Sequence, residues 1–291
     1  FSSQGHVTDA LKQLSQSLDK ARELYFRLLI LPVELTDLRE REIDANRHKY
    51  ITTHEDLNPN MRFVENEFVA ELRRNFDIQK FVSENKLSWL PDDERTLNSL
   101  LRTIKESDIY SDYMNFPATD YQTDCEFWRN IYKYIILNDP DFLEALEDKS
   151  VFWNDDIDII GTFTLKTVKR FESENHEDAI LPMFKDEEDA RFGAELFAAA
   201  VRNRETYRSY IDRFVNSSSW DSERLAFMDV VILLTSIAEI LGFPKIPTTV
   251  SINEYIEIAK CYSTPKSGQF INGMLASITT MLREDGQLTK E

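Results

Sequence analysis

The sequence is poor in glycine, cysteine and histidine, and each shortage excludes a class of structure or chemistry. Only 7 of its 291 residues are glycine. Since hairpins and tight β-turns use glycine heavily, this scarcity favours helices over sheets. The two cysteines, Cys125 and Cys261, stand far apart without the spacing of metal ligands, which fits a reducing compartment.

The usual sequence signs of catalysis are also missing. The four histidines are scattered, and neither a glycine-rich phosphate loop nor a nucleophile elbow occurs. Acidic clusters such as Asp155, Asp156 and Asp158 are more typical of solvated helix starts, although catalytic carboxylates can also meet across helices without a local signal. We therefore expect a protein that is not an enzyme and that holds no cofactor and no metal.

Long hydrophobic runs and an excess of positive charge are absent as well. No apolar run approaches the ~20 residues that span a bilayer, and the first residues lack the pattern of a signal peptide, so we expect a cytoplasmic protein away from the membrane. With 52 acidic and 34 basic residues, the formal net charge is −18. Such a chain repels nucleic acid at long range and attracts basic partners, although the same charge can serve solubility alone.

Apolar residues at intervals of three and four predict helices along most of the chain. The first predicted helix runs from Val7 to Arg47, and Pro32 should kink or interrupt it. Further helices in this half are predicted at residues 63–75, 77–85, 92–106 and 153–171, with additional starts at the Thr119–Gln122 capping box and at Asp139-Pro140.

A polar segment, Glu174–Glu188, contains Pro182 and is the candidate linker. Beyond it the pattern predicts four helices, at residues 189–214, 222–241, 252–262 and 268–284. We therefore divide the chain into a helical N-terminal portion, residues 1–186, and a compact helical bundle, residues 187–291.

The last two predicted helices and the turn between them carry the most specific pattern. Ser251 and Glu254 form a capping box before the first of them. Ser267 can cap the second, and because Lys266 stands beside this helix N-terminus, a backbone phosphate could dock there, although a plain N-cap is the more common role. Gly273 inside the last helix costs roughly 1 kcal/mol relative to alanine, which suggests close packing against a neighbour.

This region resembles the C-terminal signature of the bacterial transcription antitermination factor family NusB. The resemblance rests on residue types and spacing over both helices: Ser251-Ile252-Asn253-Glu254, Ile256, Ile258, Ala259 and Lys260, then Ser267, Phe270-Ile271-Asn272-Gly273 and Leu275. The preceding helix from Met228 to Leu241 also fits, except that Leu234 stands where the family usually has arginine. The resemblance implies an all-α fold of NusB-like helical bundles, here with an extra helical insertion at about residues 45–185.

The function that this resemblance implies is transcription antitermination. Members bind ribosomal protein S10 and the boxA RNA of ribosomal RNA transcripts, and the complex joins RNA polymerase. Carried over by position, Glu223 and Asp229 match acidic positions that face S10. The positions that touch RNA correspond to Lys266, Ser267, Gln269 and Phe270.

One departure from the family pattern concerns its Arg-rich first helix, which carries much of the RNA contact. The nearest run here, Lys20–Arg27, is thinner in arginine and matches the second family helix, so we expect the chain to lack the first. Two alternatives stay open: an acidic helical scaffold that recruits a basic protein without binding RNA, and the accessory domain of a ribosomal RNA methyltransferase. Against the second, no methyltransferase segment follows residue 291.

Overall fold

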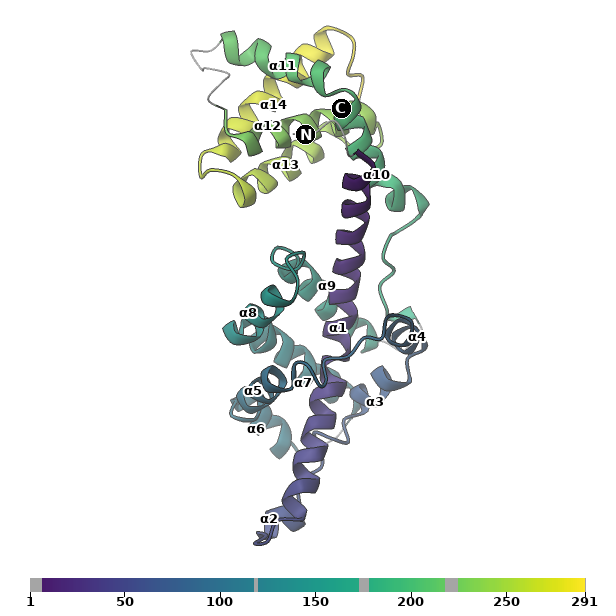
Figure 1. Cartoon of the computed structure of the whole chain (residues 1–291), viewed down its shortest axis with the longest axis vertical. Helices are drawn as coiled ribbons and strands as arrows, with labels where there is room; N and C mark the ends of the chain where they lie inside the picture. The colour runs from purple at the N-terminus through teal and green to yellow at the C-terminus, as the bar shows by residue number, and fades with distance from the viewer. Residues whose placement is uncertain (1–6, 118–119, 173–177, 218–224, 291) are drawn as a thin grey trace. The chain divides into compact units, whose positions relative to one another are not determined.

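The computed structural model of the chain describes residues 7–117, 120–172, 178–217 and 225–290 (Figure 1). Every regular element in these ranges is helical, which confirms the all-α prediction. The elements are α1 (Val7–Arg47), α2 (His54–Leu57), α3 (Glu67–Arg74), α4 (Phe76–Asn85), α5 (Glu94–Lys105), α6 (Asp108–Asn115), α7 (Tyr121–Tyr134), the 3₁₀ turn η1 (Ile136–Asn138), α8 (Pro140–Lys149), α9 (Ile157–Phe171), α10 (Glu187–Arg202), α11 (Arg204–Ser217), α12 (Phe227–Gly242), α13 (Thr248–Tyr262) and α14 (Ser267–Glu284).

The chain forms two compact units. Unit 1 comprises residues 1–15 and 184–291, and unit 2 comprises residues 16–183. Helix α1 therefore begins in unit 1 and continues into unit 2. The change of unit at residue 184 falls inside the polar segment Glu174–Glu188, of which residues 174–177 lie outside the described ranges.

Unit 2 is built on the apolar stripe of α1. Leu24, Leu28, Leu31 and Leu35 are fully buried, and their spacing of four and three residues places them on one face of the helix. They belong to one core cluster with aromatic side chains from other helices, among them Phe68, Trp128, Tyr132, Phe142 and Phe171.

Helix α1 runs through Pro32 without the interruption that the sequence predicted. A proline inside a helix has no N–H to donate to the carbonyl four residues earlier, which here is that of Leu28. The Tyr132 hydroxyl of α7 supplies the missing donor, because it donates a hydrogen bond to the Leu28 carbonyl at 2.5 Å. A side chain 104 residues along the chain thus lets the helix continue.

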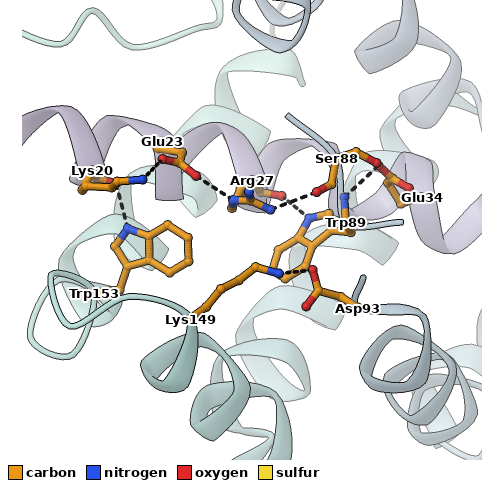
Figure 2. Close-up of polar contacts among 9 residues, drawn as sticks. All are labelled: Lys20, Glu23, Arg27, Glu34, Ser88, Trp89, Asp93, Lys149 and Trp153. Atoms are coloured by element: carbon orange, nitrogen blue, oxygen red, sulfur yellow. Dashed lines mark hydrogen bonds and ion pairs between the residues drawn. The ribbon is translucent and has the colours of Figure 1, made fainter. Parts of the chain in front are cut away.

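Two tryptophans pin loops of unit 2 to the backbone of α1 (Figure 2). The Trp153 indole donates to the Lys20 carbonyl and the Trp89 indole donates to the Arg27 carbonyl, each at 2.9 Å. The Arg27 guanidinium donates in turn to the Ser88 carbonyl at 3.0 Å. Because both indole N–H groups find partners, these large rings are buried without an unpaired donor.

Unit 1 contains the bundle of α10 to α14, in which α12 is buried along most of its length. Buried residues from each of these helices meet in a single core cluster, including Ala200, Ile211, Leu233, Ile237, Tyr255, Ala259, Leu275 and Ile278. The bundle holds α13 against both α12 and α14, so the turn that joins α13 to α14 is anchored at both ends.

Two predicted helix limits in unit 1 are wrong for local reasons. The single helix predicted at residues 189–214 is two helices: α10 ends at its C-cap Asn203, whose side-chain amide also donates to the Ala199 carbonyl, and α11 begins at Arg204. Helix α13 begins at Thr248 and not at Ile252, because the N–H groups of Val250 and Ser251 already donate to the Pro247 carbonyl.

The capping predictions at Ser251 and Thr119 also need correction. Ser251 lies inside α13, so it cannot form the predicted capping box with Glu254, and its buried hydroxyl has no partner among the described residues. Thr119 lies outside the described ranges, and the N-cap of α7 is Asp120, whose carboxylate accepts from the Thr123 N–H at 2.7 Å. Likewise Ser222 is not described, and α12 begins at Phe227.

Candidate functional site

The turn between α13 and α14 is held by hydroxyl groups. Ser267, the first residue of α14, is 1% exposed, and its Oγ accepts from the backbone N–H of Thr264 at 3.1 Å. The same Oγ lies 2.8 Å from Thr264 Oγ1 and donates to Ser263 Oγ at 3.0 Å. Ser267 is therefore a buried brace of the turn and not the N-cap of α14, because Lys266 takes the N-cap position.

Asp229 connects this turn to the start of α12. Ser263 Oγ donates to Asp229 Oδ1 at 2.6 Å, and Asp229 is only 6% exposed. A carboxylate buried in this way has little surface to offer for direct contact with a protein partner. Glu223, the other acidic position that the resemblance assigned to S10, lies outside the described residues.

The braced turn presents three predicted site residues together. Lys266 and Gln269 are exposed, and Phe270 is half-buried and packs against the unit 1 core. Within the described part of the chain, Lys266 forms no ion pair and no side chain caps the first turn of α14. A free cation, an amide, an aromatic ring and open N–H groups at a helix start suit contacts to phosphates and unstacked bases.

The close packing that the sequence predicted for Gly273 occurs instead at Gly268. A Cβ on Gly273 would meet no heavy atom within 4 Å among the described residues beyond its own helix, so the predicted close packing is wrong. The close approach occurs at Gly268, where a Cβ would lie 3.2 Å from Lys260 Cγ. The place of Gly268 directly after Ser267, at the start of a helix, is the local feature of the sequence that could have indicated this close contact.

A second buried polar pair joins α12 to α13. The Tyr255 hydroxyl donates to Glu239 Oε2 at 2.9 Å, and both residues are buried. Burial, together with the nearby Glu239 carboxylate, raises the pKa of the Tyr255 phenol, so the hydroxyl remains protonated and able to donate. Sequence reasoning missed this pair because the partners lie on different helices, 16 residues apart.

The basic run Lys20–Arg27 is used inside unit 2. The guanidinium carbon of Arg27 lies 5.6 Å from the centre of the Trp89 ring and 5.7 Å from that of Trp153 (Figure 2). Glu23 accepts hydrogen bonds from the side chains of both Lys20 and Arg27. Arg27 therefore helps to hold unit 2 together, and Lys20 is paired with Glu23 on the same helix.

Two further observations bear on the class of protein. Across the described residues, no group of three or more histidine, cysteine, aspartate or glutamate side chains is arranged to hold a metal ion. None of the described helices combines the length and apolarity that crossing a membrane requires. The described residues thus form an all-helical protein with an exposed, internally braced turn.

Comparison with known proteins identifies the family within this class. Residues 157–280, which include the turn, match the NusB family. The transcription antitermination protein NusB of Salinibacter ruber is 34% identical over 110 residues, covering 38% of this chain and 68% of the relative. The chain therefore belongs to the NusB family of transcription antitermination proteins.

Two other relatives carry the same name. NusB of Koribacter versatilis is 41% identical over 97 residues, 33% of this chain and 65% of the relative. NusB of Natranaerobius thermophilus is 43% identical over 82 residues, 28% of this chain and 58% of the relative. The chain thus spans 58–68% of the length of these three relatives, and no solved structure matches it.

Proposed function

We propose that this chain acts in transcription antitermination by binding ribosomal protein S10 and boxA RNA, and that the resulting complex joins RNA polymerase on ribosomal RNA transcripts. This work requires recognition and no catalysis, so we assign the chain a binding role in the bacterial cytoplasm. Lys266, Gln269 and Phe270 contact the RNA, with Ser267 bracing the turn beneath them, and Glu223 contacts S10.

The observation that carries the proposal is the braced turn of α14. Its hydroxyl network buries Ser267 while leaving Lys266 and Gln269 exposed next to an uncapped helix start. Single-stranded RNA is bound through phosphates and splayed bases, for which a cation, a helix N-terminus and an aromatic ring are suitable partners.

The distribution of charge removes one objection to RNA binding. Unit 2 contains 35 acidic and 21 basic residues, a net charge of −14, whereas unit 1 contains 17 acidic and 13 basic residues, a net charge of −4. Most of the acidity that would repel RNA therefore belongs to unit 2, while the α14 turn belongs to the nearly neutral unit.

Binding of labelled boxA RNA to the full chain, with and without S10 and at two salt concentrations, tests the proposal. We expect RNA binding that strengthens with S10 and weakens with salt. Lys266→Glu should reduce RNA binding and leave S10 binding intact. The control is Lys245→Glu, an exposed lysine in the segment before α13 that pairs with Glu188, and it should change neither. Loss of RNA binding in both variants would indicate a general charge effect without a site at the turn.

The charge of unit 2 also favours a second candidate, an acidic scaffold that recruits a basic protein without binding RNA. With a net charge of −14, unit 2 would hold such a partner through many weak contacts. This candidate predicts S10 binding that falls steeply with salt, no binding of boxA RNA and no effect of Lys266→Glu.

A further inference from the structure

The carboxylate of Asp229 sits in a position that a surface contact does not explain. It is the third residue of α12, where the partial positive charge of the helix start stabilises a carboxylate. The two residues before it, Phe227 and Met228, are 68% and 38% exposed, whereas Asp229 is 6% exposed. Of these three residues, only the acidic one is buried.

The hydrogen bonds that start at Asp229 have only one consistent direction. The Ser263 hydroxyl donates to the Asp229 carboxylate. The Ser263 oxygen is then free to accept from the Ser267 hydroxyl, 3.0 Å away. With its own proton committed, Ser267 Oγ accepts from the Thr264 N–H and from the Thr264 hydroxyl.

This order matters because every hydroxyl in the turn has one proton to give. Without an acceptor at position 229, the Ser263 hydroxyl could donate to Ser267 instead. The order of the hydrogen bonds in the turn would then no longer be fixed. The segment 263–267 includes Lys266 and leads into the first turn of α14. The orientation of the proposed RNA contacts therefore depends on the same hydrogen bonds.

We propose that Asp229 is a positioning residue for RNA recognition: its carboxylate fixes the Ser263–Ser267 turn and thereby sets the places of Lys266, Gln269 and Phe270. It acts through Ser263 and does not touch S10 itself. The inference rests on the proposed function for its RNA readout, while the positioning of the turn can be measured without any ligand.

The test compares Asp229→Ala with Asp229→Asn. The asparagine side-chain oxygen can still accept from Ser263 but carries no charge. If Asp229 acts by accepting this hydrogen bond, Asp229→Ala should weaken boxA binding about tenfold or more, Asp229→Asn should stay near the parent, and S10 binding should change in neither. If Asp229 contacts S10 through its charge, both variants should weaken S10 binding, and the proposal is overturned.

Two controls separate positioning from a general loss of stability. Glu239→Ala removes another buried carboxylate of α12 that bonds a hydroxyl of α13, but it does not touch the turn. It should destabilise unit 1 while RNA affinity of the folded protein stays within about twofold of the parent. Ser263→Ala should reproduce the RNA defect of Asp229→Ala, and the double variant should be no weaker than either single one, because one chain of bonds is broken only once.

Amide hydrogen exchange of residues 263–268 completes the test without RNA. We expect faster exchange in this segment for Asp229→Ala and unchanged exchange for Asp229→Asn. If the parent chain does not bind boxA, the proposed function fails, and this exchange experiment alone decides whether Asp229 positions the turn. Unchanged exchange in Asp229→Ala refutes the positioning role, whatever the RNA result.

Discussion

The hydrogen bond from Tyr132 to the Leu28 carbonyl should be the interaction that allows a proline in the middle of α1. Tyr132→Phe removes only the hydroxyl and leaves the fully buried Leu28 carbonyl without a partner at the position where Pro32 has no N–H. Leaving a buried acceptor unpaired costs about 1–3 kcal/mol, so the free energy of unfolding of unit 2 should fall by that amount.

Substitution of Pro32 distinguishes this explanation from ordinary packing. Pro32→Ala restores a backbone N–H four residues after Leu28, and this N–H can donate to the same carbonyl. In the Pro32→Ala background, Tyr132→Phe no longer leaves the carbonyl unpaired, so it should cost less by about 1 kcal/mol than in the parent. If the cost is the same in both backgrounds, the hydroxyl stabilises unit 2 for another reason.

Urea unfolding followed by tryptophan fluorescence can measure this difference in unit 2 alone. Three of the four tryptophans, Trp89, Trp128 and Trp153, are buried in unit 2. The fourth, Trp220, belongs to unit 1 and can be replaced by phenylalanine in all variants. Every remaining tryptophan then belongs to unit 2, so the fluorescence transition reports the unfolding of unit 2.

Three further predictions concern other parts of the chain. Gly273→Ala should raise the free energy of unfolding of unit 1 by about 0.5–1 kcal/mol in urea titrations, since Gly273 has open space around it; Gly161→Ala should bring no such gain to unit 2, because its Cβ would lie 2.8 Å from a leucine of η1. Burial would raise the pKa of Glu42, but hydrogen bonds from a lysine and an arginine outweigh it and hold the pKa below its usual value. This stabilisation is present above about pH 4.3 and is lost as the pH falls through the folded-state pKa, so Glu42→Gln should be less stable than the parent at pH 7 and equal to it at pH 2. Tyr255→Phe should lower the free energy of unfolding of unit 1 by about 1.5–3 kcal/mol in thermal unfolding followed by circular dichroism, because a buried carboxylate loses its donor.

The presence of the helices could be predicted from sequence, because it depends on the spacing of apolar residues within each helix. Their limits depend on partners that spacing does not reveal. Pro32 predicts a helix break from sequence alone, because the group that donates to the Leu28 carbonyl in its place is the Tyr132 hydroxyl on another helix. Ser251 is predicted as an N-cap because serine followed by glutamate three residues later is common at helix starts. The hydrogen bonds to the Pro247 carbonyl, however, begin α13 earlier.

For the site, the sequence predicted the position of the turn but not the contacts between helices that hold it. Local residue types and the family resemblance indicated the turn at Lys266 and Ser267, and the structure brings both to the start of α14. The bracing role of Ser263 and the buried pair of Tyr255 and Glu239 depend on contacts between helices, which no local pattern shows.

The burial of Asp229, by contrast, could have been inferred from the register of its own helix. Leu233, Ser236 and Ile240 follow it at intervals of four, three and four residues, so Asp229 falls on the face of α12 that also bears these residues, and all of them are buried. An acidic residue on that face, at the start of a helix, has two ways to be stable: the positive end of the helix and a donor from inside the bundle. The structure supplies both, the N-terminus of α12 and the Ser263 hydroxyl, and the second of these cannot be found by matching a family position.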